Sequence, residues 1–587
     1  MTADTTMEKL VELAKRRGFF VQSVGAYGGV SGFYTYGPHG APLKSNVEEA
    51  WRDRFVVEEG HQEVDAPTVM PEPVFEASGH LDGFDDMLVE CPECGESHRA
   101  DHLVEDATDV EDAEALPIAE VEALVAEHDI ACPTCGTALA GQSINDFNLM
   151  FETNIGPGSS SPGYLRPETV QGIFVEFPQL KEYARGQLPF GVAQIGRAYR
   201  NEISPRKSII RTREFTQAEL DLFIDPAEDE PDLSGVADET LALYSAPAQN
   251  ADDGEVREMT VREAVKEGPI GDEWIAYYLG ITKRWYDRIG VDMDRFRFRQ
   301  HLAGERAHYA SDCWDAESEI DGDWIELAGF SYRSDYDLRK HGDHSGEDFT
   351  VFKQYDEPRT VERATVDPDM SELGPEFGAA AADVAAALEE LVERDPGAFE
   401  GDEVAVDVDG DTYEVPVEVT GFGVEEVTEN GEHVLPHVVE PSFGVDRLVY
   451  TVLHHNYRED VVDEEERVYL AFDPEVAPTT VAVFPLMDRD GMGERARELE
   501  TDLRKSGFAT AYDDSGAIGR RYRRQDEVGT PFCVTVDHRT LEDGTVTVRE
   551  RDSTEQRRVP ADDLPGVLTD LRDGARSFDD LTEYDLV

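Results

Sequence analysis

Basic residues and long apolar segments are both scarce in this sequence. Its 587 residues hold 53 lysines and arginines against 127 aspartates and glutamates, so the formal net charge at pH 7 is −74. At low ionic strength such a charge repels itself and repels nucleic acid. Either the protein avoids polyanions, or it works in near-molar salt, where the Debye length is about 3 Å. Because the acidic residues are spread over every segment, we favour the second explanation, a halophilic surface.

No apolar run approaches the length of a membrane-spanning helix. Residues 6–17 mix charged and apolar side chains, which predicts a surface helix and not a signal peptide. We therefore expect a cytoplasmic protein that has no membrane partner. A hydrophobic content of 40% is enough for packed interiors, and the length suggests two to four domains.

Six cysteines are present, and four of them form two C-P-x-C-G knuckles, at Cys91/Cys94 and Cys132/Cys135. Two such knuckles provide the four thiolates of a tetrahedral zinc site. The alternative is that these thiols are redox-active or incidental. A closed site of four sulfurs is structural, so we assign no catalysis to it.

Two stretches differ in texture from their surroundings. Residues 225–300 are polar and irregular, and residues 356–435 are acidic, so we interpret both as insertions. From about residue 476, strand and helix patterns alternate, which predicts a compact α/β domain with a mainly parallel sheet. Gly519–Arg524 is expected to be a basic turn within that domain.

The segment from Ala198 to Phe223 concentrates several kinds of chemistry. In an extended strand Arg200 and Glu202 would share a face. There a guanidinium can fork onto a phosphate and a carboxylate can accept from an amino group. A cationic island follows, unusual in so acidic a chain, and consists of Arg206, Lys207, Arg211 and Arg213.

Residues 214–223 alternate like a strand, with the apolar residues between them facing the core. Phe215, Gln217, Glu219 and Asp221 would lie on the opposite face. Phe215 and Glu219 would be about 13 Å apart, a distance that suits a purine ring at one end and an ammonium at the other. The pattern favours an enzyme that uses ATP.

These residues also resemble a known family. Arg200-x-Glu202 followed by Arg211-x-x-x-Phe215 resembles motif 2 of the class II aminoacyl-tRNA synthetases; residues 443–447 resemble motif 3, and the Pro67 segment resembles motif 1. The segments AYGGVSGFYTYGPHG, RADHL, LRPETVQGIF, DCWDAE, WIELAGF and VEPSFGVDR together resemble the homodimeric glycyl-tRNA synthetases of archaea and eukaryotes. The C-terminal IGRRYRRQDEVGTPF resembles that family's anticodon-binding domain. The ordered conjunction is far more specific than any single motif.

The resemblance implies an α+β fold. A seven-stranded type of antiparallel sheet would be flanked by helices, with a zinc-ribbon-like insertion and a C-terminal α/β anticodon-binding domain. The implied segments are 1–90 (catalytic domain with motif 1), 91–140 (ribbon-like insertion), 141–224 (core with motif 2), 225–300 (insertion), 301–355 (core), 356–435 (acidic insertion), 436–475 (core with motif 3) and 476–587 (anticodon-binding domain).

The resemblance also implies ATP and Mg²⁺ at the site. Arg200 would hold the α-phosphate, Glu202 the adenine amino group and Arg447 the γ-phosphate, and these three residues would carry the catalytic role. The remaining ATP-binding residues would be Asn201, Arg211 on the triphosphate, Phe215 stacked on adenine, Glu326 acting through magnesium, Leu327 and Gly444.

A cage of carboxylates would hold the ammonium of glycine, and tight walls around the α-carbon would exclude larger amino acids by size. The implied glycine-binding residues are Arg99, Glu168, Phe215, Glu219, Glu440 and Ser442. The partner would be tRNA(Gly), whose anticodon stem would contact Arg520, Arg521, Arg523 and Arg524. A homodimer is implied by the family alone.

Two other readings stay open. Another class II synthetase for a small amino acid would share motifs 2 and 3, but would not readily supply Glu168, Glu219 and Glu440 together. A non-catalytic RNA-binding protein with a synthetase-like fold would be expected to lose motif residues, and here they are all present. Class I synthetases are disfavoured because the chain has no HIGH tetrapeptide, and P-loop enzymes because it has no Gly-Lys pair.

Overall fold

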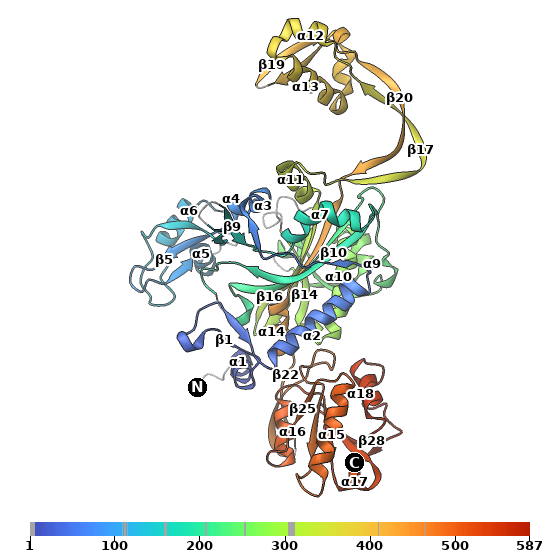
Figure 1. Ribbon diagram of the computed structural model, residues 1–587. Helices are drawn as coiled ribbons and strands as arrows, with labels where there is room; N and C mark the ends of the chain where they lie inside the picture. The colour runs from blue at the N-terminus through green and yellow to red at the C-terminus, as the bar shows by residue number, and fades with distance from the viewer. Residues whose placement is uncertain are drawn as a thin grey trace. The chain divides into compact units, whose positions relative to one another are not determined.

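The chain folds into two compact units, one of residues 1–184, 188–349 and 436–587 and the other of residues 185–187 and 350–435. The computed structural model (Figure 1) describes residues 6–587 apart from 109, 111–112, 114–115, 158–160, 206–207, 252–253, 303–311, 409 and 463. Arg206 and Lys207 of the predicted cationic island thus lie outside the described residues. None of the described helices is long and apolar enough to cross a membrane.

The first unit is built on a nine-stranded sheet in the order β13-β12-β14-β15-β16-β21-β11-β10-β3. Neighbouring strands run antiparallel, except that β12 is parallel to β14 and β10 to β3. The predicted antiparallel sheet is therefore present, with nine strands in place of seven. The strands are β3 (Gln62–Glu63), β10 (Phe190–Tyr199), β11 (Glu214–Ile224), β12 (Thr240–Tyr244), β13 (Arg257–Thr260), β14 (Phe296–Gln300), β15 (Cys313–Ile320), β16 (Asp323–Ser334) and β21 (His437–Gly444).

Strand β11 lies inside the sheet between β10 and β21, and from Thr216 to Ile224 every residue is buried. The alternation predicted from the sequence is confirmed on its apolar side, where Ala218, Leu220 and Leu222 join the main hydrophobic core. Residues of helices α2 (Gly40–Arg52), α10 (Glu273–Arg288) and α14 (Val445–His455) belong to the same core. The polar side chains of β11 consequently lie on the other face of the sheet.

Phe443, the residue before the end of β21, is the centre of an aromatic cluster. Its ring centroid lies 5.9 Å from that of Trp51, 4.8 Å from Phe55, 5.8 Å from Trp285 and 5.8 Å from Phe330. These rings come from α2, from the turn of helix that follows it, from α10 and from β16, and all of them are at most 2% exposed. The cluster fixes the end of β21 against the helical layer.

The sequence predicts an insertion at residues 225–300, and here the structure differs. Strands β12, β13 and β14 extend the central sheet, and α10 covers it with nine buried residues. Leu241, Met259 and Phe298 belong to the same core as β11. The segment looks irregular in the sequence because its strands are short and separated by polar turns, so that no run is long enough to show a period.

A small subdomain carries the four paired cysteines. Its sheet, in the order β6-β5-β7, consists of β5 (Asp85–Glu90), β6 (Ser97–Arg99) and β7 (Ile144–Asn148), and α5 (Ala100–Ala107) and α6 (Ile118–Glu127) pack on a core of its own. A second three-stranded sheet joins β4 (Val69–Pro71), β9 (Pro162–Leu165) and β8 (Phe151–Asn154). It leads into α7 (Gln171–Tyr183), the helix before β10.

The C-terminal part contains a six-stranded sheet in the order β25-β24-β26-β27-β28-β29. The predicted α/β domain is present, but only β24 with β25 and β24 with β26 are parallel, and the other three pairs are antiparallel. Helix α16 (Ile518–Asp526) occupies the expected basic turn. The elements are β24 (Val481–Pro485), α15 (Met492–Lys505), β25 (Thr510–Tyr512), β26 (Phe532–Val536), α17 (His538–Asp543), β27 (Thr545–Glu550), β28 (Gln556–Pro560), α18 (Leu564–Arg572) and β29 (Asp585–Leu586).

The second unit has its own hydrophobic core, around Leu373, Val384, Leu388 and Val404. A long two-stranded ribbon joins β17 (Val351–Thr365) to β20 (Gly423–Val434), and the hairpin of β18 (Glu403–Val408) and β19 (Asp411–Pro416) accompanies α12 (Met370–Phe377) and α13 (Ala381–Arg394). Because it possesses a core, this acidic segment is a folded body and not a solvated loop.

Removing the Phe443 ring is expected to destabilise the catalytic unit strongly. Phe443→Ala would leave a cavity among four large aromatic side chains, and such substitutions cost about 3–5 kcal/mol. Urea unfolding followed by tryptophan fluorescence measures this, since Trp51 and Trp285 both contact the ring. Phe443→Leu, which keeps most of the volume, should lose clearly less, and equal losses for the two variants would contradict the packing argument.

Candidate active site

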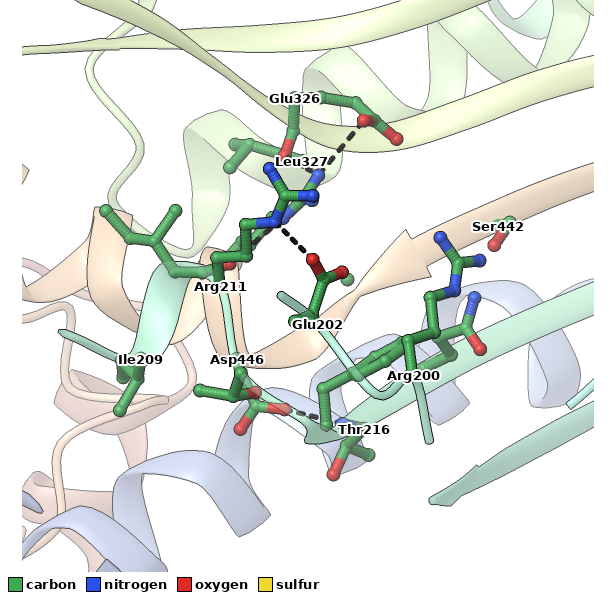
Figure 2. Close-up of a pocket in the computed structure, with 15 residues that line it drawn as sticks. Arg200, Glu202, Ile209, Arg211, Thr216, Glu326, Leu327, Ser442 and Asp446 are labelled. Carbon is green, nitrogen blue, oxygen red and sulfur yellow. Dashed lines mark hydrogen bonds and ion pairs between the residues drawn. The ribbon is translucent and has the colours of Figure 1, made fainter. Parts of the chain in front are cut away.

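A cavity opens where β11, β16 and β21 meet the loop after β10 and the start of α14 (Figure 2). Besides Ile209, Ile210, Thr212, Thr216, Gln217 and Asp446, it is lined by Arg200, Glu202, Arg211, Phe215, Glu326, Leu327, Ser442, Gly444 and Arg447. All nine residues of this second group are sequence-predicted site residues. The structure thus brings together three segments more than a hundred residues apart.

Arg200 and Glu202 reach the cavity from a loop and not from a strand, because β10 ends at Tyr199. The Arg200 Nε donates to the Pro167 carbonyl at 3.2 Å, and its guanidinium carbon lies 5.5 Å from the centre of the Phe215 ring. A cation and an aromatic face are therefore adjacent, as phosphate and purine recognition would require. Asn201 does not line the cavity, and its backbone N–H donates to the Leu149 carbonyl at 2.8 Å.

Two cations of the cavity are already paired with carboxylates. The Nε of Arg211 donates to Glu202 Oε2 at 2.6 Å, and Arg447 Nη1 donates to Glu326 Oε2 at 3.0 Å. Partial burial raises the pKa of Glu326, but Arg447 and, less strongly, Arg200 outweigh it and hold the pKa below its ordinary value. The carboxylates fix the arginine side chains in place before any ligand arrives.

Glu219 is the most completely bound carboxylate at the site. Its Oε1 accepts from Ser442 Oγ at 2.7 Å and from Gln217 Nε2 at 2.9 Å, and its Oε2 accepts from the Val170 N–H at 2.7 Å and from Thr169 Oγ1. Its side chain is 1% exposed. Burial is the main reason that its pKa is raised, with the nearby Glu168 adding to the shift and the bonds from Thr169, Ser442 and Val170 opposing it.

Two further predicted glycine-binding carboxylates lie around Glu219. Glu168 contacts Gln171 Nε2 at 2.9 Å and His80 Nε2 at 3.4 Å. Burial raises its pKa, but His80, Arg333 and Gln171 outweigh it and hold the pKa well below the ordinary value. Glu440, by contrast, has its pKa raised to about 7 by burial and by Glu219 and Glu168, against the opposing effect of Arg333.

Arg333 is a functional residue that the sequence did not single out. It is 6% exposed and donates to Glu440 Oε2 at 2.6 Å and to both oxygens of Asp337 at 2.7 and 2.9 Å. The i,i+4 spacing of Arg333 and Asp337 across a strand-to-helix junction is a weak signal, because such pairs are common on surfaces. Only the fold shows that this pair is buried behind Glu440.

Asp221 lies on the same face of β11 as Glu219, and the flanking register places it opposite Glu440 on β21. It is fully buried, and neither carboxyl oxygen has a hydrogen-bond partner in the described part of the chain. Burial, then Glu440 and Glu219, raise its pKa well above the ordinary value. A buried charge without hydrogen-bond partners is very costly, so the environment of this carboxyl favours its neutral form.

Arg99, the sixth predicted glycine-binding residue, is placed differently. It pairs with Asp86 at 2.9 Å and forks onto Asp101. Burial raises the pKa of Asp86 to about 6 against the effect of Arg99, and the more distant Glu202 and Arg211 also act on it. Its pairs with Asp86 and Asp101 tie the edge of the cysteine-bearing subdomain together.

Residues of the glycine-rich segment 26–40 are hydrogen-bonded to groups at or next to the cavity wall. The Tyr36 hydroxyl and the Thr216 N–H both donate to Asp446, each at 2.5 Å, so this buried carboxylate ties α14 to β11. Gly32 has a φ of +76° and accepts through its carbonyl from the Arg213 N–H at 2.8 Å. Asp446 precedes Arg447 in the FGVDR motif, and this position is the sequence feature that could have identified it as a residue of the cavity.

The four paired cysteines come together as predicted. Their sulfurs all lie within 4.8 Å of one another, with Cys91 and Cys135 at 3.5 Å and Cys94 and Cys132 at 3.7 Å. Sulfurs bound tetrahedrally at about 2.3 Å from zinc would be about 3.8 Å apart, so the donor set fits that ion. Cys313 and Cys533 are buried and separate.

The basic run of the C-terminal domain does not form one surface. Arg521 is 3% exposed and donates to the Pro485 carbonyl at 2.5 Å and to the Gly516 carbonyl at 2.8 Å. Its guanidinium is thus not available to an RNA phosphate, and the prediction was wrong for this residue because a helix sends successive side chains in different directions. Arg523 and Arg524 are half-buried and pair with Asp526 and Asp513. Arg520 is exposed.

Comparison with known proteins agrees with this site. A family model described as "tRNA synthetase class II core domain (G, H, P, S and T)" matches residues 160–385, and one described as "Anticodon binding domain" matches residues 480–571. The chain is 50% identical over 575 residues to a glycine–tRNA ligase of Methanothrix thermoacetophila, covering 97% of this chain and 98% of the relative. It is 48% identical over 568 residues to that of Methanothermobacter thermautotrophicus, covering 96% and 99%. With that of Archaeoglobus fulgidus it shares 47% over 580 residues, covering 98% of each.

The raised pKa of Glu440 makes the stability of the folded protein depend on pH. Between an unfolded pKa of about 4.3 and the folded value of about 7, the folded state binds the extra proton, so stability falls as pH rises through this window. The slope contributed by this group is at most about 1.4 kcal/mol per pH unit. Urea unfolding from pH 4.5 to 8 at constant salt should show that Glu440→Gln removes this part of the slope. A difference between the two proteins that does not change with pH would contradict the assignment.

Proposed function

We propose a role for each residue of the cavity from one premise: the chain belongs to the glycine–tRNA ligases, a family of class II aminoacyl-tRNA synthetases. The protein attaches glycine to tRNA(Gly) in two steps. ATP and glycine first form glycyl-adenylate with release of pyrophosphate, and the glycyl group is then transferred to tRNA with release of AMP. The observation that carries the proposal is the convergence of motif 2, motif 3 and the Glu326 segment on one cavity.

ATP would lie along the row of arginines. Arg200 would hold the α-phosphate and Arg447 the γ-phosphate, and Arg211 would contact the triphosphate. Glu202 would accept from the adenine amino group, with Phe215 stacked on the ring. Leu327 and Gly444 line the same cavity. Asn201 lies between Arg200 and Glu202 and would act through its backbone, which is bonded to Leu149. Since Arg211 and Arg447 are each held by a carboxylate, ATP binding exchanges an internal ion pair for a phosphate contact.

Magnesium fits beside Glu326. Class II synthetases generally use Mg²⁺ with ATP, and a half-exposed carboxylate with a depressed pKa is the kind of oxygen ligand that this ion takes. When bound, the ion would neutralise charge on the phosphates.

Glycine would occupy the cage of Glu168, Glu219, Glu440 and Ser442, next to Phe215. Four donors surround the Glu219 carboxyl group, and no cation is hydrogen-bonded to it among the described residues, which suits a site for an ammonium. Arg333 positions Glu440 from behind. Arg99 would complete the glycine site from the edge of the neighbouring subdomain, where it pairs with Asp86 and Asp101.

The chemistry needs positioning more than reactive side chains. The glycine carboxylate attacks the α-phosphorus in line, the P–O bond to pyrophosphate breaks, and the arginines stabilise the developing charge. A ribose hydroxyl at the 3′ end of tRNA then attacks the carbonyl carbon of the adenylate and displaces AMP. No protein nucleophile is required in either step.

The other parts of the assignment rest on the family. The partner is tRNA, with α16 and in particular Arg520 on the face available to it. A homodimer and a cytoplasmic location follow from the family resemblance. The matching core model alone would also allow another class II synthetase, but the relatives that match nearly the whole chain are glycine–tRNA ligases. A non-catalytic protein is disfavoured because Arg200, Glu202, Phe215 and Arg447 all line one cavity.

Exchange of pyrophosphate into ATP tests the amino-acid specificity. In high-potassium buffer, glycine should stimulate exchange by the wild-type protein, while alanine, serine and proline should not. Glu168→Gln should raise the KM for glycine by about 10- to 100-fold, since it removes a charged partner of the ammonium, and should leave the KM for ATP unchanged. Stimulation by alanine or serine but not glycine would overturn the glycine assignment.

The cysteine cluster predicts one structural zinc ion per chain. Elemental analysis of protein purified without chelator should find one zinc, and replacement by cobalt should give the absorption of four thiolate ligands. Cys132→Ser should lose the metal and the fold of the subdomain, because Cys132 belongs to its core. The matched control Cys533→Ser, a buried thiol outside the cluster, should keep the zinc. Wild-type protein that contains no zinc by elemental analysis would contradict the proposed zinc site.

A further inference from the structure

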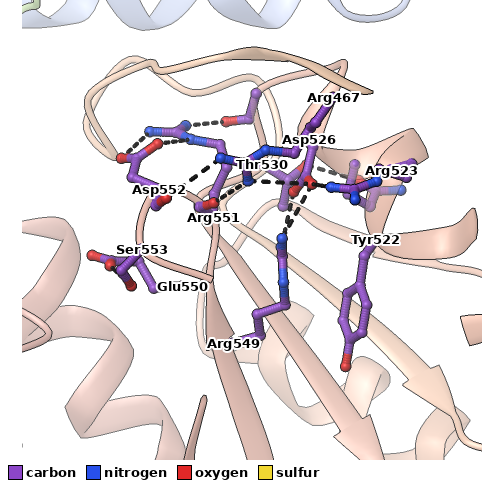
Figure 3. A network of polar contacts seen from close by, with 12 residues as sticks. Arg467, Tyr522, Arg523, Asp526, Thr530, Arg549, Glu550, Arg551, Asp552 and Ser553 are labelled. Carbon is purple, nitrogen blue, oxygen red and sulfur yellow. Dashed lines mark hydrogen bonds and ion pairs between the residues drawn. The ribbon is translucent and has the colours of Figure 1, made fainter. Parts of the chain in front are cut away.

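Helix α16 ends in a buried network of arginines and aspartates (Figure 3). Asp526, its last residue, is completely buried and receives Arg549 Nη1 at 2.9 Å and Nη2 at 3.2 Å from β27. Arg467 and Arg523 approach the same carboxylate at 3.6 and 3.7 Å. Arg549 lies in the sheet of the C-terminal domain and Asp526 in its helix α16. Arg467, by contrast, comes from a segment that precedes this domain.

Arg467 belongs to a hairpin of β22 (Tyr457–Val462) and β23 (Glu465–Leu470) that directly follows α14. It is 1% exposed and pairs with Asp460 across the hairpin. Its Nη1 donates to the Arg551 carbonyl at 2.6 Å, in the turn between β27 and β28. One side chain thus ties the end of the catalytic core to two elements of the C-terminal domain.

A reciprocal contact crosses in the other direction. Arg551, 2% exposed, donates from Nη1 to the Gly529 carbonyl and from Nη2 to the Phe472 carbonyl, both at 2.9 Å. The Phe472 ring packs so closely on Gly529 that a Cβ at that position would meet it at 2.3 Å. The segment after α16 is therefore held against the catalytic core by hydrogen bonds and by packing.

A third tie lies near the surface. Arg17, in α1 (Thr6–Arg17), donates from Nε to Glu527 Oε2 at 2.5 Å, directly after α16. In molar salt such partly exposed pairs are weakened, whereas buried pairs are screened much less. Arg467 and Arg551 are buried, so salt weakens their contacts between the two domains least.

We propose that Arg467 is a positioning residue for the tRNA step: it holds α16 at a fixed place relative to the catalytic cavity, so that one tRNA molecule can engage both domains at once. This rests on the proposed function. Two contact regions held at a fixed separation make the second contact intramolecular, which raises the effective concentration. A loosened joint loses that advantage without altering either contact region.

Arg467→Met separates this role from folding. Methionine fills a similar volume, Asp526 keeps its two bonds from Arg549, and Asp460 is 35% exposed and can be hydrated. Pyrophosphate exchange with glycine needs only the catalytic core, so it should stay within about twofold of wild type. In aminoacylation the KM for tRNA should rise about tenfold, with kcat nearly unchanged. Arg467→Lys should restore part of the loss.

The control is Arg558→Met. Arg558 is 9% exposed and pairs with Asp537 at 2.6 Å, but both residues lie within the C-terminal domain. This variant should lower thermal stability about as much as Arg467→Met and leave the KM for tRNA within about twofold. An unchanged KM in Arg467→Met, or an equal rise in Arg558→Met, would overturn the inference.

Failure of the two proposals can be told apart. If the wild-type protein shows no glycine-dependent exchange, the proposed function fails. If exchange is present and Arg467→Met charges tRNA with the wild-type KM, only the positioning role fails.

Discussion

A carboxylate in the middle of a buried strand is the constraint on which this structure depends. Glu219 lies inside the sheet with 1% of its surface exposed, and no basic side chain is hydrogen-bonded to it among the described residues. Burying such a group costs several kcal/mol unless it is fully hydrogen-bonded. Its four donors come from β11, from β21 and from the residues just before α7, so these three segments must assemble for the charge to be tolerated. The carboxylate oxygens of Glu219 that would bind the ammonium are therefore the same atoms that hold these three segments together.

The cavity is nearly neutral before a substrate enters. Arg211, Arg333 and Arg447 each hold a carboxylate, so ligands exchange partners with groups that are already in position. The cost of ordering long arginine side chains is met during folding and not during binding. Asp221 and Glu440 contribute in the opposite sense, because their raised pKa values limit the negative charge that accumulates under the cage.

Much of the site could be predicted from the sequence, because the motif residues stand on strands or next to them and short-range patterns reveal strand faces. The faces of β11, the cysteine cluster and the cavity-lining residues of motifs 2 and 3 were found in this way. What the sequence did not show depends on long-range packing. Arg99 lies against Asp86 and Asp101, and Glu440, a partner of Arg333, lies 107 residues away from it. The basic run became a helix, which splits four neighbouring arginines between interior and surface, and residues 225–300 hid three sheet strands behind weak periodicity.

Some of the chain's few basic side chains are buried. Seven arginines are buried among the described residues: Arg166, Arg333, Arg467, Arg521, Arg549, Arg551 and Arg557. Thirteen carboxylic side chains are buried among the same residues, so the surface keeps most of the acidic excess behind the net charge of −74. RNA affinity normally falls with salt because each phosphate contact releases counterions. A protein with few basic residues on its surface releases few counterions when it binds RNA. Cations from the solution must instead accumulate between the acidic protein surface and the RNA phosphates. Its affinity for tRNA should then vary little with ionic strength or rise with it, the reverse of the usual thermodynamic signature.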